Sequence, residues 1–202
     1  MGFKDQAVAQ TDLLLWQQMK QGNELAFGKL IKKYANFLQN YGYKFIRDEA
    51  FIKDCVQEVF IEIWNRRDQI STPESVRAYL LSSVRKRVIR QSYRQRISKD
   101  DEPALSESDL TMTDFSPEWF IMEQESLVEM TQRVTEILNQ LPKRQREVIY
   151  LRFYQNLDRE EIAQIMGVHL QSVSNLLQSA FKSFREYWTG FWLLLSWYEI
   201  MR

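Results

Sequence analysis

The stretch REEIAQIMGVHLQSVSNLLQSAF, residues 159–181, has the hydrophobic spacing of a helix-turn-helix. Ala163 is small where two helices would cross closely, and Gly167 stands at a turn that often needs a positive φ. Val173 and Leu176 would then face back into a shared core. The stretch therefore predicts two short helices joined by a tight turn, although an ordinary helical hairpin would show the same spacing.

The outward side of the second predicted helix carries amides and hydroxyls, and no Lys or Arg occurs from Glu160 through Phe181. Gln and Asn can make bidentate hydrogen bonds to adenine, whereas Lys and Arg supply most of the affinity for phosphates. The helix can therefore read base edges but supplies little affinity. The outward residues are Gln171, Ser172, Ser174, Asn175, Gln178 and Ser179. Flanking cations that could add phosphate contacts are Lys143, Arg144, Arg146, Arg152, Lys182 and Arg185.

Length and composition limit the class of protein. A chain of 202 residues can form one large or two small cores. The single Cys excludes an internal disulfide, and with a single His it leaves no zinc or haem site, so we expect no cofactor and no metal. No signal peptide is evident, and no apolar run reaches the roughly 20 residues of a membrane helix. We therefore expect a cytoplasmic protein.

Charge is segregated along the chain although the net charge is zero. Residues 85–99 contain seven cations and no acid, and residues 100–132 contain ten acids and no cation. The stretch SKDDEPALSESDLTMTDFSPE, which begins at residue 98, combines two prolines with many polar residues and has no helical period, as is typical of a linker. The pattern predicts an acidic linker at 98–117, between domains at 1–97 and 118–190.

Apolar spacing of three and four residues predicts helices in both domains. Before the linker it occurs in LAFGKLIKKYANFLQNYGYKF (25–45), FIKDCVQEVFIEIW (51–64) and VRAYLLSSVRKRVIRQSYRQR (76–96). After the linker, helices are expected at about 118–140, 143–154, 159–166 and 170–188. Strand patterns are nearly absent. The predicted fold class is all-α, with two small helical domains joined by an acidic linker and a helix-turn-helix in the second.

Two segments in this order carry a family resemblance. DCVQEVFIEIW (54–64) contains the pattern Asp-x-x-Gln-Glu-x-Phe, and the segment that runs from LPKRQREVIYLRFYQNLDREE into the helix-turn-helix contains Leu-Pro-x-x-x-Arg-Glu. Across roughly residues 10–188 the chain resembles an extracytoplasmic-function (ECF) sigma factor of bacterial RNA polymerase. The resemblance implies a DNA-binding initiation subunit with two helical domains that is not an enzyme.

The resemblance gives the 54–64 helix a partner. Its apolar residues cover one side of the helix. Without the resemblance, the polar residues on the other side would equally be interpreted as a surface that contacts only solvent. By resemblance, this polar side docks on the β′ subunit of core RNA polymerase, with further contacts to β. The predicted docking residues are Asp54, Gln57, Glu58 and Glu62. Cys55 is expected to be a small buried hydrophobe.

The basic helix that follows would bind the minus-ten element, although a solvated basic helix is the simpler alternative. Its cations are spread over much of the circumference, and two tyrosines could stack on exposed bases. The predicted residues are Tyr79, Arg85, Lys86, Arg87, Arg90, Tyr93 and Arg94. By similarity, the loop at 66–75 captures an unpaired base. Lys86 stands where the family usually has Asn, so selectivity at minus ten is in question.

By resemblance, the second domain docks at the minus-thirty-five element of promoter DNA. Its predicted contacts are the outward residues of the second helix together with Arg144 and Lys182. The family commonly has a basic residue at Ser179, so this chain is expected to bind duplex weakly. The linker would thread through the nucleic-acid channels of the polymerase, where its charge mimics RNA.

Alternative functions remain open at this point. A stand-alone helix-turn-helix regulator would not need the docking face, and no paired nucleophile and base or phosphate loop supports an enzyme. A sigma-like adaptor targeted by a partner protein is consistent with Lys86 and Ser179. The tail FWLLLSWYEIMR (191–202) could anchor at a membrane surface or dock an anti-sigma factor or activator. We expect it to pack partly on the second domain and leave an aromatic edge accessible.

Overall fold

Helices account for every regular element in the part of the chain that the structure describes. The computed structural model describes residues 3–97 and 125–201, with side chains at 9–94 and 131–188. The all-α prediction is confirmed. The predicted linker at 98–117 and residues 118–124 of the predicted helix at 118–140 lie outside the described part.

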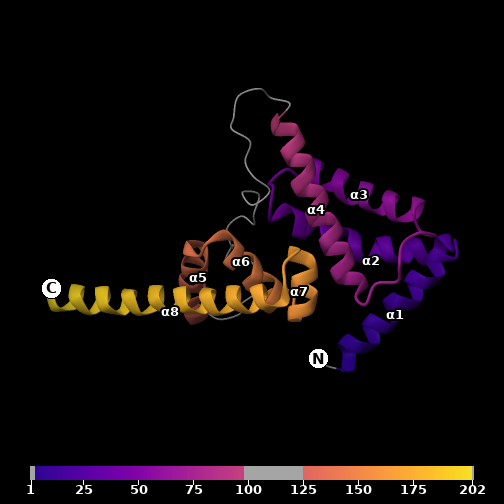
Figure 1. Ribbon diagram of the computed structural model, residues 1–202. Helices are drawn as coiled ribbons and strands as arrows, with labels where there is room; N and C mark the ends of the chain where they lie inside the picture. Colours follow the sequence, from indigo (N-terminus) through magenta and orange to yellow (C-terminus); the bar gives the residue numbers. More distant parts are fainter. Residues whose placement is uncertain (1–2, 98–124, 202) are drawn as a thin grey trace. The chain divides into compact units, whose positions relative to one another are not determined.

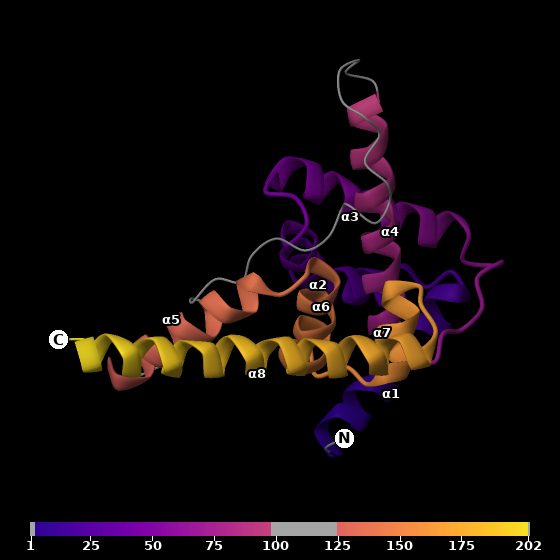
Figure 2. The same cartoon turned by 60° about the vertical axis from the view of Figure 1, so that its left-hand side comes forward.

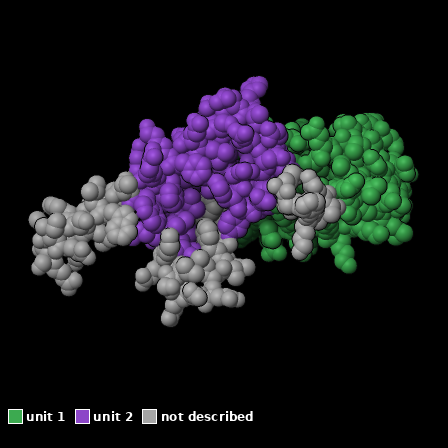
Figure 3. Space-filling model, turned by 90° about the horizontal axis from the view of Figure 1, so that it is seen from below, with its two compact units in different colours: residues 1–110, 164–167 green, residues 111–163, 168–202 purple. Residues whose placement is uncertain are grey.

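The chain divides into two units (Figure 3). The first contains residues 1–110 and 164–167, and the second contains 111–163 and 168–202. The helices of the first unit are α1 (Phe3–Lys20), α2 (Glu24–Tyr43), α3 (Glu49–Asn65) and α4 (Val76–Ile97) (Figure 1). The helices of the second are α5 (Glu125–Gln140), α6 (Lys143–Ile149), the π-helix η2 (Tyr150–Tyr154), α7 (Arg159–Met166), whose residues 164–166 fall in the first unit, and α8 (Leu170–Met201).

Helix α1 packs against α2 and α4 and was not predicted. Trp16 and Met19 are fully buried, and the buried carboxylate of Asp12 accepts hydrogen bonds from Tyr34 Oη (2.6 Å) and Lys33 Nζ. Burial of a carboxylate is unfavourable unless it is hydrogen-bonded and paired. These two partners on α2 therefore fix where α1 lies.

Helices α2 and α3 begin at side-chain caps and pack closely. The carboxamide of Asn23 accepts from the amide of Ala26, and the carboxylate of Asp48 accepts from that of Phe51, both at 3.0 Å. A Cβ at Gly42 would lie 2.7 Å from the side chain of Ile52, so only glycine permits this approach. The packed pair gives α4 a surface on which to lie.

In the second unit, α6 packs against α8, and η2 follows α6 without a break (Figure 2). The amide of Gln155 donates to the carbonyl of Tyr150 at 3.0 Å, and Asn156 has a φ of 49°. Arg152 donates from Nη1 to the carbonyl of Leu157 at 2.8 Å. These bonds end η2 and fix the turn that leads into α7. The sequence pattern predicted this region as one ordinary helix.

Helix α8 extends well beyond residue 188, where the sequence pattern predicted its end. A single glycine within a helix costs only about 1 kcal/mol, so Gly190 does not stop it. The tail at 191–202 continues the same helix as far as Met201. The side chains of residues 189–202 lie outside those described, so the packing of the tail remains a prediction.

Candidate nucleic-acid and protein-binding surfaces

Helix α3 presents one polar side to solvent. Asp54, Gln57, Glu58 and Glu62 are all exposed on it. Ile61, which is 51% exposed, lies among them and was missed, because a single apolar residue on a polar face leaves no periodic signal. The opposite side of α3 is buried through Ile52, Cys55, Val56, Val59, Phe60 and Ile63. We refer to Asp54, Gln57, Glu58, Ile61 and Glu62 as the α3 face.

Two carboxylates of the α3 face are paired with α4. Arg87 donates from Nη1 to Glu58 Oε2 at 3.2 Å and from Nη2 to Glu62 Oε2. Arg66 also pairs with Glu62, at 3.2 Å between Nη1 and Oε1. Among the described residues, Asp54 forms no ion pair. The α3 face is therefore partly neutralised by the protein's own arginines.

Cys55 supports this pairing from the interior. Its Sγ donates to Gln91 Oε1 at 2.8 Å, and Gln91 Nε2 donates to Glu58. Burial, assisted by the negative charge of Glu58, raises the pKa of the Cys55 thiol to about 12. The thiol therefore stays protonated and serves as a hydrogen-bond donor within the core.

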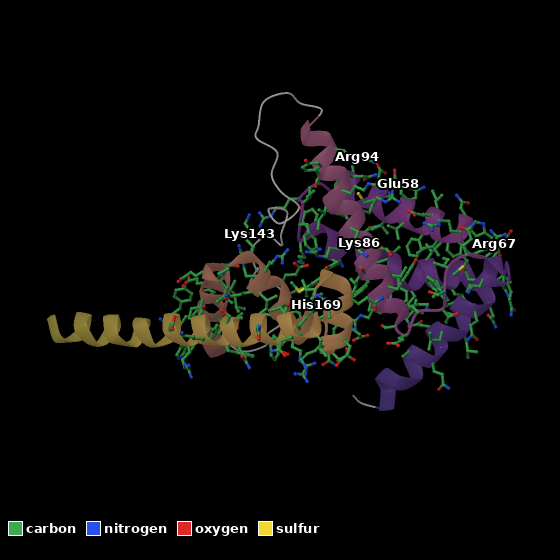
Figure 4. The ribbon with its side chains drawn as sticks, viewed as in Figure 1. Glu58, Arg67, Lys86, Arg94, Lys143 and His169 are labelled. Carbon is green, nitrogen blue, oxygen red and sulfur yellow. The ribbon has the colours of Figure 1, made fainter. Side chains whose placement is uncertain are left out.

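The cations of α4 are less widely spread than the sequence pattern suggested. Lys86, Arg90, Tyr93 and Arg94 are exposed, and their spacing of four, three and one residues places them on one side of the helix. Figure 4 labels Lys86 and Arg94 on α4. We refer to these four residues as the basic stripe. Arg85 and Arg87 are half-buried at its two edges. A single cationic strip matches a nucleic-acid backbone better than a ring of charge.

The two predicted stacking tyrosines lie in different surroundings. The ring of Tyr79 packs edge-on against buried Trp16, with centroids 5.1 Å apart, and burial raises its pKa. Tyr93 is 37% exposed within the basic stripe. Tyr93 is therefore the tyrosine of this pair with more of its surface open to a base.

The loop after α3 is held by an aromatic stack. Arg67 lies over the ring of Trp64 at 4.7 Å and donates from Nη1 to its carbonyl at 2.9 Å. Trp64 in turn stacks on Phe27, with centroids 4.9 Å apart. The stack fixes the start of the loop at 66–75, and its arginine and tryptophan are half-buried.

The turn of the helix-turn-helix forms as the sequence predicted. Asp158 Oδ1 accepts from the amide of Glu161 at 2.8 Å, and Glu161 Oε2 accepts from the amide of Asp158 at 3.1 Å. This reciprocal pair is a capping box that starts α7. Gly167 has a φ of +65°, which few other residues adopt readily. Ile162 on α7 and Val173 on α8 are fully buried, as predicted for the two helices of the motif.

Helix α8 exposes the predicted base-reading side chains along one side. Gln171, Asn175, Gln178, Ser179 and Lys182 are exposed, whereas Ser172 and Ser174 are half-buried. Gln171 Nε2 donates to Asn175 Oδ1 at 3.0 Å, so the two amides are held side by side. We refer to residues 171, 174, 175, 178, 179 and 182 as the α8 face. Hydrogen-bonding groups predominate on it, with Lys182 as its cation.

The cations around the α8 face differ in availability. Arg144 and Lys143 are exposed on α6, whereas Arg146 is only 7% exposed and belongs to the core. Arg146 was suggested as a flanking phosphate contact, and its burial argues against that role. Arg159, the first residue of α7, was not predicted, because it lies outside the second helix of the motif and its contact with that helix is tertiary. It donates from Nη1 to Ser174 Oγ at 3.5 Å and is exposed beside the α8 face.

Ser179 on α8 forms a side-chain hydrogen bond with α6. Its Oγ accepts from Gln145 Nε2 on α6 at 3.0 Å, and the serine remains exposed.

No described group of His, Cys, Asp and Glu side chains is placed to hold a metal ion. Within the described residues, no helix has the length and apolar character needed to cross a membrane.

Family comparisons agree with both halves of this arrangement. The model "Sigma-70 region 2" matches residues 30–97, which contain the α3 face and the basic stripe. The model "Sigma-70, region 4" matches residues 131–184, which contain the helix-turn-helix. Together the two matches cover more than half of the chain.

Known proteins show the same likeness. RNA polymerase sigma factor NccH of Alcaligenes xylosoxydans xylosoxydans is 24% identical over 171 residues, which cover 84% of this chain and 90% of NccH. ECF RNA polymerase sigma factor SigK of Mycobacterium ulcerans is 22% identical over 173 residues, which cover 85% and 90%.

A solved structure extends the likeness to the fold. The sigma factor RpoE in complex with the anti-sigma factor NepR from Bartonella quintana matches with a TM-score of 0.54 and 18% identity over 81% of this chain and 96% of that one. The helical arrangement, the two family matches and these relatives agree with one another. This chain belongs to the ECF sigma factors of the sigma-70 family, and it binds core RNA polymerase and directs transcription initiation at promoters.

Proposed function

We propose that the α3 face is the surface that binds core RNA polymerase. Asp54 is exposed without an ion-pair partner among the described residues, Gln57 is exposed on the same side, and Ile61 adds apolar surface beside them. A polar face that includes an exposed isoleucine is typical of a protein interface, in which apolar contact and charge act together. This exposed face is the observation on which the docking assignment rests.

The docking assignment is tested by changing charge without disturbing packing. Asp54→Lys should weaken binding to core polymerase at least tenfold, because the helix would then present a cation to a polymerase surface that binds an anion. Glu49→Lys is the matched control, since Glu49 is an exposed acid on the same helix outside the α3 face. Both variants should melt close to the wild type. Equal core affinity of wild type and Asp54→Lys would contradict the assignment.

We propose that the basic stripe binds the separated strand of the minus-ten element. Three cations and an exposed tyrosine along one helix side suit a backbone that carries one phosphate per nucleotide and bases that can stack. Tyr79 is assigned a lesser part, because its ring is packed on Trp16. Arg85 stays at the edge of this surface. The loop at 66–75 is the proposed place for an unpaired base.

We propose that the α8 face reads the minus-thirty-five element in the major groove. The adjacent amides of Gln171 and Asn175 can each make two hydrogen bonds to an adenine. Arg144, Arg159 and Lys182 are exposed around the face and are the proposed phosphate contacts. Ser172, half-buried, is placed at its edge.

We further propose how the chain is divided and where it acts. The proposed parts are residues 1–97 for core and minus-ten binding, 98–117 as linker, 118–190 for minus-thirty-five binding and 191–202 as tail. The proposed place of action is the cytoplasm, where the polymerase and the chromosome are, and catalysis is not part of the proposed role. An anti-sigma factor is a proposed partner, because RpoE is known in complex with NepR.

The tail is proposed to pack partly on the second domain and to leave an aromatic edge for a partner. Deletion of residues 191–202 distinguishes packing from docking. Packing predicts a lower melting temperature, whereas docking predicts intact stability and loss of partner capture. The proposal fails if the truncated protein equals the full chain in stability, partner capture and transcription.

A second candidate is a sigma-like adaptor whose DNA targeting comes from a partner. The absence of Lys and Arg from 160–181 favours it, because phosphate contacts supply most of the affinity for duplex. Transcription of a genomic DNA library by core polymerase, with and without this protein, separates the two. Promoter-specific starts support autonomous targeting, whereas core binding without specific starts supports the adaptor.

A further inference from the structure

Arg87 belongs to both proposed surfaces of the first unit. It is part of the basic helix α4, yet its guanidinium donates to Glu58 and Glu62 of the α3 face. Its side chain remains 27% exposed, so it is reachable from solvent. The residue therefore lies between the surface assigned to the polymerase and the surface assigned to DNA.

The guanidinium is held by the α3 face in the free protein. Each terminal nitrogen donates to a carboxylate, so two negative charges offset the positive charge of Arg87 and weaken its attraction for a phosphate until these pairs open. Glu58 and Glu62 are about half exposed, so water and salt compete for their charges and the pairs are easily exchanged. A cationic partner surface that binds these carboxylates would displace Arg87.

Once displaced, Arg87 would join the basic stripe. Its neighbours along the helix are Lys86 and Arg90, both exposed, and the long arginine side chain can turn toward that side. We propose that the Arg87–Glu58/Glu62 contact is a clasp that core polymerase opens, which releases Arg87 to bind the separated DNA strand. This inference rests on the proposed docking and strand-binding surfaces.

The clasp couples the two binding events. Free protein would hold one strand-binding cation in an internal ion pair, and the polymerase-bound protein would not. Because such coupling is reciprocal, strand binding by Arg87 would also strengthen docking on the carboxylates it leaves. The protein would thus bind single-stranded DNA better as part of the holoenzyme than alone.

The first test compares Arg87→Ala with Arg90→Ala in both states. The probe is fluorescent single-stranded oligothymidylate, with binding by core alone subtracted. Loss of one phosphate contact should lower affinity about threefold and reduce the slope of log affinity against log salt by about 0.7. Arg90→Ala should show this loss in free protein and holoenzyme alike. Arg87→Ala should show it in the holoenzyme but not in the free protein.

The second test opens the clasp without the polymerase. In free protein, Glu58→Gln with Glu62→Gln should raise oligothymidylate affinity about threefold and steepen the salt slope by about 0.7. Glu24→Gln with Glu49→Gln removes the same charge from exposed sites elsewhere in the unit and should raise the oligothymidylate affinity by a smaller factor. The gain should vanish when Arg87→Ala is added, because only a released Arg87 produces it.

The outcomes separate the clasp from the surfaces on which it rests. A gain that persists in the presence of Arg87→Ala, or equal loss from Arg87→Ala in both states, would overturn the clasp. Arg90→Ala without effect in either state would instead overturn the basic stripe as a strand-binding surface. Thermal melting of Arg87→Ala checks that the packing of α3 on α4 survives the substitution. If Arg87→Ala is unstable, the Glu58→Gln with Glu62→Gln variant still tests the clasp, because it retains Arg87.

Discussion

The exposed side of α4 carries three cations and a tyrosine, whereas the exposed side of α8 carries amides, hydroxyls and one lysine. Cations attract any phosphate backbone and lose strength as salt rises, whereas amides distinguish bases and respond little to salt. If both helices bind DNA, one contributes mainly to affinity and the other mainly to sequence selectivity. The first supplies affinity for an opened strand, and the second supplies the choice of sequence.

The largest expected effect on DNA opening comes from removing charge on α4. Arg90→Ala with Arg94→Ala should lower open-complex formation about tenfold and reduce the salt slope by about 1.4, as expected for two lost strand contacts. Permanganate reactivity of unpaired thymines measures the opening. Lys29→Ala with Lys32→Ala, exposed cations of α2, is the charge-matched control. Equal effects of the two pairs would mean that the stripe acts only through net charge.

A second effect should appear on α8 as a change of preference. Gln171→Ala with Asn175→Ala should reduce discrimination between promoter duplexes by about 1–3 kcal/mol per lost bidentate contact and leave the salt slope unchanged. Competition among duplexes from a randomised minus-thirty-five library measures this. Gln132→Ala with Gln140→Ala, exposed amides of α5, should leave the preference intact. A reduced salt slope would show that the amides face phosphates.

The smallest expected effect is a gain from adding charge to α8. Ser179→Arg should tighten duplex binding and steepen the salt slope by about 0.9, because Ser179 is exposed on the α8 face. The hydrogen bond that it accepts from Gln145 is lost at little cost at an exposed site. Ser179→Gln, which adds no charge, is the control. If arginine and glutamine behave alike, position 179 does not face the backbone.

Local patterns in the sequence predicted most of the helices. Regular apolar spacing located α2, α3, α4, α7 and the start of α8, and Gly167 has the positive φ that its turn needed. Helix α1 was missed because three consecutive leucines at 13–15 obscure the spacing of its buried residues, and one of them, Leu14, is exposed. The π-helix was missed because its hydrogen bonds depend on the loop that follows it.

The candidate surfaces were predictable as residue types but not as contacts. Glu58 and Arg87 are 29 positions apart, and no local pattern reveals that α3 and α4 bring them together. Arg146 and Arg144 look alike in the sequence, yet packing of α6 on α8 buries one and exposes the other. Such differences depend on tertiary packing and not on spacing along one helix.

The division of labour between α4 and α8 is tested most directly by mapping transcription start sites on genomic DNA with core polymerase and three forms of this protein. We predict that Arg90→Ala with Arg94→Ala lowers transcript yield at all starts of the wild type by a similar factor. Gln171→Ala with Asn175→Ala should change which starts are used. If the arginine pair changes the choice of starts, or the amide pair lowers all starts uniformly, the division between affinity and selection is contradicted.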